Sequence, residues 1–199
     1  MQNNRIQTIV EISLCVALSV VLNYVSIRLP FNIAGGSISL TMLPIAVIAL
    51  RRGLFAGTAA GTVFGFIDLF MEPYILVPAQ VALDYPVPYL LFGLGVGVFA
   101  GLYRSGQNST DRQDGAGTSP RFSFMRSLIT VIAVFSGGCL RFFSHVLSGV
   151  LFFAEYAGEQ NVWLYSLVYN ISYLGPSVVA TLLCALVLLP ILDRAVPVR

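Results

Sequence analysis

Charged residues are scarce in this sequence: only 10% of its 199 residues are Asp, Glu, Lys or Arg, and lysine is absent. Soluble domains carry about 25% charged residues, so this chain has too few to cover a surface that faces water. Its hydrophobic content of 57% indicates that lipid surrounds most of the molecule. We therefore expect an all-α membrane protein, because continuous helices satisfy their own backbone in lipid.

Catalytic and metal-binding patterns are also missing. The sequence contains no HExxH, GxSxG or P-loop motif, and its single histidine, His145, has no metal-ligand partner at helical spacing. The cysteines Cys15, Cys139 and Cys184 lie in apolar runs without CxxC spacing, which argues against zinc and disulfides. We expect no enzyme activity, metal, cofactor or nucleic-acid partner. An intramembrane hydrolase built on Asp84 and His145 is the alternative left open.

Six apolar stretches approach the roughly 20 residues that a membrane-spanning helix needs. The expected helices are residues 6–29, 37–50, 54–70, 78–103, 124–153 and 162–192. The first lacks a small-residue cleavage site, so we expect a retained span rather than a signal peptide. The second is short and could be tilted, broken or partly re-entrant. We expect a single domain over residues 1–199, with a flexible polar loop at about 105–120 joining two three-helix halves.

The positions of the arginines predict the orientation, because cytoplasmic loops are enriched in basic residues. With the N-terminus inside, nine arginines lie on the cytoplasmic side, and only Arg28 lies outside. The nine are Arg5, Arg51, Arg52, Arg104, Arg112, Arg121, Arg126, Arg194 and Arg199. We therefore expect a multi-pass protein of the cell membrane with both termini and the 105–120 loop in the cytoplasm.

Glycines recur at every fourth residue in two of the expected helices. One series is Gly53, Gly57, Gly61 and Gly65, and the other is Gly93, Gly97 and Gly101. Small residues at this spacing let helices approach closely in lipid, so we expect a tight bundle. A conduction pathway lined by glycine is the alternative.

Polar side chains from at least five segments fall at one depth, near the expected outer ends of the helices. They include Asn23, Asp68, Tyr74, Asp84, Arg141, His145, Tyr165 and Asn170. Ionisable groups in lipid are costly and usually mark function or pairing, so we expect one pocket open to the outside. The alternative is scattered interhelical hydrogen bonding plus an aromatic belt at the membrane interface.

The chemistry of these residues favours a cationic, aromatic ligand. Asp84 can neutralise a cation, and the faces of Tyr and Phe attract one. Arg141 is expected to pair with Asp68 as a structural ion pair between two helices, because buried charges are usually paired. Tyr165 and Asn170 lie about 140° apart on a regular helix. They can share a ligand only if it lies alongside that helix, or if the helix is irregular.

Four segments resemble a known family. Residues 37–70, SISLTMLPIAVIALRRGLFAGTAAGTVFGFIDLF, and residues 74–86, YILVPAQVALDYP, are similar to the ThiT/YuaJ family. These proteins are the thiamine-specific S components of energy-coupling factor (ECF) vitamin transporters. The segments RFFSHVLSGVLFF (141–153) and YSLVYN (165–170) extend the resemblance, and LRRG and DYP are its most specific parts.

The resemblance implies a six-helix fold with both termini cytoplasmic and a thiamine site near the outer face. The matching positions are Tyr74, Asp84, Tyr85, His145, Tyr165 and Asn170, and Phe153 is the seventh residue expected to contact the ligand. The family has Glu at the position of Asp84. It has Trp at the position of Phe153 and in the first outer loop, which here reads NIAGGS (32–37).

The resemblance also implies partners: a shared transmembrane T component and two ATPases. Docking onto them uses small residues of the first helix, for which Ser13 and Ala17 are the nearest match. The leading hypothesis is thus a thiamine-binding S subunit in the lipid bilayer. The alternatives are a binder of a thiamine precursor or another cationic heterocycle, and a stand-alone proton-coupled carrier.

Overall fold

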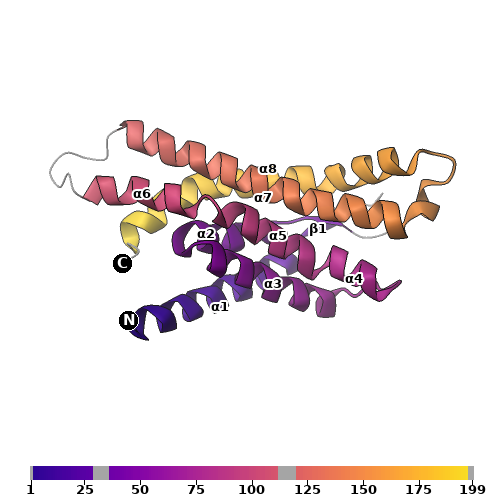
Figure 1. Ribbon diagram of the computed structural model, residues 1–199, viewed down its shortest axis with the longest axis horizontal. Helices are drawn as coiled ribbons and strands as arrows, with labels where there is room; N and C mark the ends of the chain where they lie inside the picture. Colours follow the sequence, from indigo (N-terminus) through magenta and orange to yellow (C-terminus); the bar gives the residue numbers. More distant parts are fainter. Residues whose placement is uncertain (1, 29–35, 112–119, 197–199) are drawn as a thin grey trace.

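A computed structural model describes residues 2–28, 36–111 and 120–196 of the chain and shows an elongated helical bundle (Figure 1). The elements are α1 (Gln2–Tyr24), β1 (Ile27–Arg28), β2 (Ser37–Ile38), α2 (Met42–Arg52), α3 (Leu54–Met71), α4 (Pro78–Asp84), α5 (Pro86–Gly97), α6 (Ala100–Asp111), α7 (Pro120–Phe152), the 3-10 turn η1 (Ala154–Ala157) and α8 (Val162–Ala195). Helix α1 begins and α8 ends at the same end of the bundle (Figure 1).

The expected all-α membrane fold is confirmed. Within the described residues, five helical stretches are long and apolar enough to cross a membrane. The second expected span, residues 37–50, is shorter than predicted, because residues 37–38 form a strand and only Met42–Arg52 is helical. Eleven residues rise about 16 Å at 1.5 Å per residue, so α2 cannot cross the bilayer alone. It lies at the centre of the bundle, where Met42 to Arg51 are all buried.

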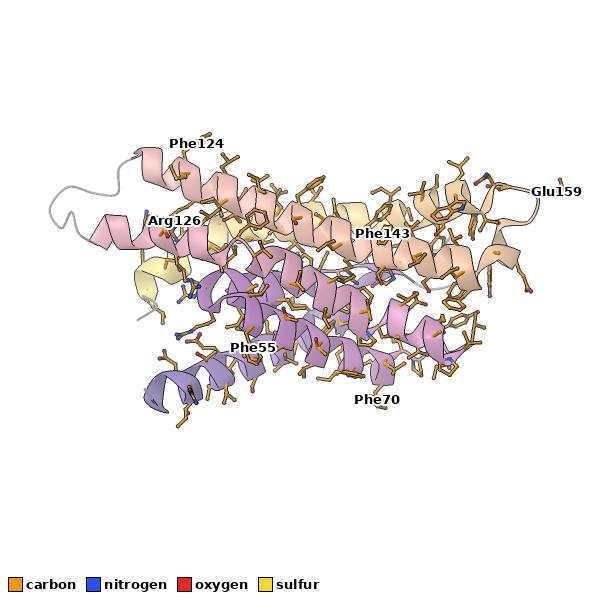
Figure 2. All side chains as sticks on the ribbon, viewed as in Figure 1. Phe55, Phe70, Phe124, Arg126, Phe143 and Glu159 are labelled. Atoms are coloured by element: carbon orange, nitrogen blue, oxygen red, sulfur yellow. The ribbon has the colours of Figure 1, made fainter. Side chains whose placement is uncertain are left out.

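The outer surface of the bundle is apolar, as lipid contact requires. Phe55 and Phe70 of α3 are each 82% exposed, and Phe70 lies at the outer edge of the bundle (Figure 2). Phe124 and Phe143 of α7 are also exposed on the outside. Such a surface would be costly in water, and it is the surface expected of a multi-pass membrane protein.

The helix expected over 78–103 is broken in two places, so the prediction of one continuous helix is wrong, although Pro78–Ser105 is still one stretch long and apolar enough to cross a membrane. Helix α4 ends at Asp84 and α5 starts at Pro86. Proline has no N–H and disfavours the helical conformation in the residue before it, which here is Tyr85 with φ −115° and ψ −81°. The second break, at Val98 and Phe99, separates α5 from α6.

Part of the predicted 105–120 loop is helical, because α6 continues to Asp111 and α7 starts at Pro120. Residues 112–119 lie outside the described residues, as do residues 32–35 of the NIAGGS segment.

The glycine spacing produces the close packing that was expected, chiefly between α3 and α5. A Cβ built on Gly61 would lie 2.1 Å from the Tyr89 carbonyl oxygen, and one on Gly93 would lie 2.1 Å from the Gly57 carbonyl oxygen. Backbone therefore packs directly on backbone, which no larger residue would permit. Gly101 is different, because a Cβ there would meet nothing within 4 Å.

Ion pairs cross-link the helices at the end of the bundle where α1 begins. Asp193 of α8 accepts from Arg51 at 2.5 Å and from Tyr103 at 2.6 Å, and it also pairs with Arg126 of α7. Arg52 forms a bidentate pair with Glu11 of α1, each contact 2.5 Å long. Arg51 and Arg52 of the LRRG segment thus connect α2 to α8 and α1. Arg126, the third arginine of these ion pairs, is labelled in Figure 2.

Candidate functional site

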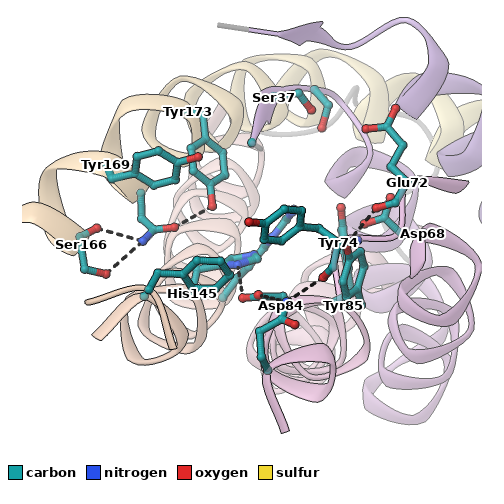
Figure 3. Close-up of a pocket in the computed structure, with 18 of the residues that line it drawn as sticks. Ser37, Asp68, Glu72, Tyr74, Asp84, Tyr85, His145, Ser166, Tyr169 and Tyr173 are labelled. Carbon is teal, nitrogen blue, oxygen red and sulfur yellow. Dashed lines mark hydrogen bonds and ion pairs between the residues drawn. The ribbon is translucent and has the colours of Figure 1, made fainter. Parts of the chain in front are cut away.

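A cavity of about 190 Å³ lies at the other end of the bundle. Its lining comes from α1, α3, α4, α5, α7, α8, the β2 segment and two connecting loops. All seven expected binding positions line it: Tyr74, Asp84, Tyr85, His145, Phe153, Tyr165 and Asn170. The structure thus gathers these polar groups into one pocket rather than scattering them. Figure 3 shows the α8 side chains on one side and Asp68 and Glu72 across from them.

Asp84 and His145 face each other at this cavity. Asp84 Oδ1 lies 3.7 Å from His145 Nδ1, and the two side chains are 19% and 11% exposed. The break after α4 sets the position of Asp84, and Ser144 of α7 holds this end of α4 by donating a 2.9 Å hydrogen bond to the Leu83 carbonyl. The Nε2 of His145 is buried and has no hydrogen-bond partner in the described part of the chain.

Helix α8 contributes one continuous arc of side chains. Tyr165 and Asn170 form its two edges, and Ser166, Tyr169 and Tyr173 fill the 140° between them. The two expected residues therefore share the cavity, because the helix lies alongside it. Asn170 is held by its neighbours: its Nδ2 donates to the Ser166 carbonyl at 2.9 Å, and its Oδ1 accepts from Tyr173 at 2.6 Å.

Aromatic rings from two loops form a roof beside Asp84, defined by Tyr74, Phe153 and Tyr156. The rings of Tyr74 and Phe153 stack with centroids 5.9 Å apart and planes at 24°. The hydroxyls of Tyr74 and Tyr156 lie 2.7 Å apart in a hydrogen bond, which raises the pKa of Tyr74. These contacts join the loop after α3 to the turn after α7.

The expected ion pair between Asp68 and Arg141 does not form, and this prediction was wrong. Asp68 instead accepts a 2.8 Å hydrogen bond from Asn23 of α1. Arg141 lies over the ring of Tyr89, with its Cζ 3.9 Å from the centroid, and no described carboxylate pairs with it directly. Asp68 is bonded to the amide of Asn23, and Arg141 lies on the ring face of Tyr89. The prediction rested on the equal depth of Asp68 and Arg141 along their helices, which gives no information on these other partners.

The charges around the cavity favour a cationic ligand. Asp68, Glu72 and Asp84 contribute carboxylates, and Arg141 is the guanidinium in the lining. Tyrosine and phenylalanine faces add to the attraction for a cation, and each such contact is worth about 0.5–2 kcal/mol.

Comparison with known proteins identifies the relatives of this chain. A family model described as thiamine transporter protein (Thia_YuaJ) matches residues 9–197. The chain belongs to this family. It is 33% identical over 190 residues to the thiamine transporter ThiT of Bacillus subtilis, covering 94% of this chain and 91% of that protein. It is 30% identical over 176 residues to ThiT of Lacticaseibacillus paracasei, covering 85% and 80%.

The fold agrees with a solved member of the Thia_YuaJ family. The structure of ThiT from Listeria monocytogenes superposes with a TM-score of 0.69 at 27% identity, covering 97% of this chain and 96% of that one. These relatives are transporters, in line with the expectation that the chain is not an enzyme. Together with the apolar helices, they make this a multi-pass protein of the plasma membrane.

Ser13 and Ala17, the expected docking residues, lie on α1 away from the cavity. Both are exposed on the outside of the bundle. Ser13 Oγ donates to the Ile9 carbonyl at 3.0 Å, so it is satisfied within its own helix. The two residues are placed where a partner in the membrane could reach them, and their role in docking stays a prediction.

Several cavity residues escaped the sequence analysis. Tyr169 and Tyr173 follow Tyr165 at four-residue spacing, a pattern that could have revealed the α8 arc. Gln80 lies four residues before Asp84 and could have been found in the same way. Tyr156 gave no such signal, because it lies in the short 3-10 turn η1 and outside the long helices.

Proposed function

We propose that this member of the Thia_YuaJ family binds thiamine in the cavity and serves as the substrate-binding S subunit of an ECF transporter. The main support is the convergence of the seven expected positions on one cavity that holds Asp84, His145 and a tyrosine-rich wall. Thiamine carries a permanent cationic ring and an aminopyrimidine ring. A carboxylate, aromatic faces and an amide edge are the groups that suit those features.

The proposed ligand contacts divide by chemistry. Asp84 neutralises the charge of the thiazolium, and the faces of His145 and Phe153 enclose a ring. Tyr165 and Asn170 lie along α8 and read the edge of the pyrimidine. Tyr74 and Tyr85 border the cavity from the loop after α3 and from the start of α5.

The proposed orientation has both termini and the Asp193 ion-pair cluster in the cytoplasm, with the cavity at the outer face. The nine-to-one distribution of arginines supports this orientation. Energy for uptake would come from a T component and two ATPases, since the sequence carries no P-loop of its own. Ser13 and Ala17 are the proposed docking positions.

Two measurements on the purified protein test this proposal. Mass spectrometry identifies any ligand that copurifies, and calorimetry measures thiamine binding in detergent. We expect thiamine to bind tightly, while proteoliposomes that contain this chain alone do not accumulate it. Accumulation under a proton gradient would favour the stand-alone carrier. Tight binding of a different heterocycle, with weak binding of thiamine, would favour the precursor.

A further inference from the structure

Gln80 is the one fully enclosed amide next to the Asp84 carboxylate among the residues described, with 1% of its surface exposed. The two residues lie four apart on α4, so their side chains share one face of this helix. Gln80 Nε2 donates to Asp84 Oδ2 at 2.5 Å. The amide therefore contacts the oxygen of Asp84 that does not face His145.

The same amide also holds the loop that carries Tyr74. Gln80 Nε2 donates to the Tyr74 carbonyl at 3.1 Å, and Gln80 Oε1 accepts from the Leu76 N–H at 3.1 Å. These partners fix the orientation of the amide, because an N–H needs the oxygen while a carbonyl and a carboxylate need the nitrogen. Glutamate at this position could not supply both donors.

Hydrogen bonds of the Tyr85 side chain also hold the loop that carries Tyr74. The Tyr85 hydroxyl accepts from the Tyr74 N–H at 2.7 Å and donates to the Glu72 carbonyl at 2.9 Å. Tyr74 in turn stacks on Phe153 and bonds to Tyr156 in the aromatic roof. A short path of hydrogen bonds thus runs from Asp84 through Gln80 to Tyr74 of the roof.

We propose that Gln80 is a positioning residue that holds the Asp84 carboxylate and the Tyr74 roof in one geometry, so that capture of a cation at Asp84 and its retention under the roof are coupled. This inference rests on the proposed function, in which Asp84 receives the cationic ring. A side chain that merely filled space would need no amide. The three matched hydrogen bonds make Gln80 specific for both tasks at once.

The first test compares Gln80→Met, which keeps the volume and removes every hydrogen bond, with the matched control Gln160→Met on the exposed turn before α8. Stopped-flow and calorimetric measurements use thiamine as the probe. We expect Gln80→Met to raise the thiamine dissociation rate and Kd at least tenfold, because the roof no longer holds the ligand. The control should keep both within twofold of the parent.

The second test uses Gln80→Glu, which places two carboxyl groups within hydrogen-bonding distance. Such a pair shares one proton, and losing that proton forces two like charges together. The other charged or titratable groups that act on Asp84 and its neighbour His145 are Arg141 of α7, Tyr173 of α8 and Tyr85. Because thiamine is a cation, it binds the doubly charged pair more tightly, so the thiamine affinity of Gln80→Glu should rise as pH rises from 5.5 to 8, more steeply than that of the parent.

The outcomes separate this inference from the function on which it rests. A merely structural role would lower the melting temperature and the fraction of protein that binds, yet leave Kd, dissociation rate and pH profile at parental values. That result, with the parent binding thiamine, overturns the inference alone. Failure of the parent itself to bind thiamine overturns the proposed function, and the inference with it. If Gln80→Glu fails to fold, the kinetics of Gln80→Met decide.

Discussion

Gly61 of α3 packs directly against the backbone of Tyr89 in α5, so that a methyl group on Gly61 would lie 2.1 Å from the Tyr89 carbonyl oxygen. Backbone cannot move aside as a flexible side chain can. Gly61→Ala should therefore destabilise the protein by about 1–3 kcal/mol, the usual cost of overpacking. Thermal unfolding in detergent measures the change. Gly101→Ala is the control, because its added methyl meets nothing within 4 Å, and it should melt at or above the parental temperature.

Asp193 should be far more important to stability than an exposed charge on the same helix. It is 8% exposed and pairs with both Arg51 and Arg126. Asp193→Asn leaves the buried Arg51 and the partly buried Arg126 without their carboxylate, which should cost about 3–5 kcal/mol. Thermal unfolding of Asp193→Asn beside the exposed Arg194→Gln checks this. Equal melting of both variants and the parent would show that the cluster does not hold the helices together.

Asp84→Asn should weaken thiamine binding at least tenfold, about 1.4 kcal/mol, because it removes the negative charge and keeps the shape. Calorimetry measures the affinity. Glu159→Gln, on the exposed turn before α8, is the matched loss of a carboxylate and should bind as the parent does. Asp84→Glu, which introduces the residue of the family pattern, should retain binding. The assignment of Asp84 fails if Asp84→Asn binds as tightly as the parent.

Phe153→Trp should tighten thiamine binding by two- to tenfold. The larger ring, next to Tyr74 in the roof, offers thiamine a wider aromatic face. Aromatic pairs contribute about 0.5–1.5 kcal/mol. Phe143→Trp, at an exposed position of α7 ten residues before Phe153, is the control and should leave affinity unchanged. If Phe153→Trp abolishes binding while another heterocycle binds the parent tightly, thiamine is not the ligand.

Long apolar runs predicted the long helices well, because a stretch such as α8 has no alternative in lipid. The same reasoning failed over 78–103, where Pro86 and Pro88 gave a visible signal of a break. It also failed at residues 37–38, whose pairing with Ile27 and Arg28 is too short to leave a strand pattern. A long helix and a proline break are local properties of the sequence, whereas a two-residue ladder depends on what packs around it.

The candidate site was predictable in composition and less so in contacts. Depth along each helix placed Asp84 and His145 together, since both lie near the same end of the bundle. Depth alone could not predict that Asn23 would form a hydrogen bond with Asp68, or that Arg141 would lie over the ring of Tyr89. Choosing among partners at equal depth requires the rotation of each helix about its axis, which a single sequence does not specify.

The length of α7 and α8 has a consequence for how a ligand arrives. At about 1.5 Å per residue their 33 and 34 residues extend about 50 Å, whereas the hydrocarbon core of a bilayer is about 30 Å thick. Tilt absorbs only a small part of this difference, so the helix ends stand among the lipid headgroups. Trp163 and Tyr24, both exposed near the cavity end, are the residue types that anchor at that boundary. A hydrated cation can therefore reach Asp84 from the headgroup layer, without giving up its water to the lipid tails.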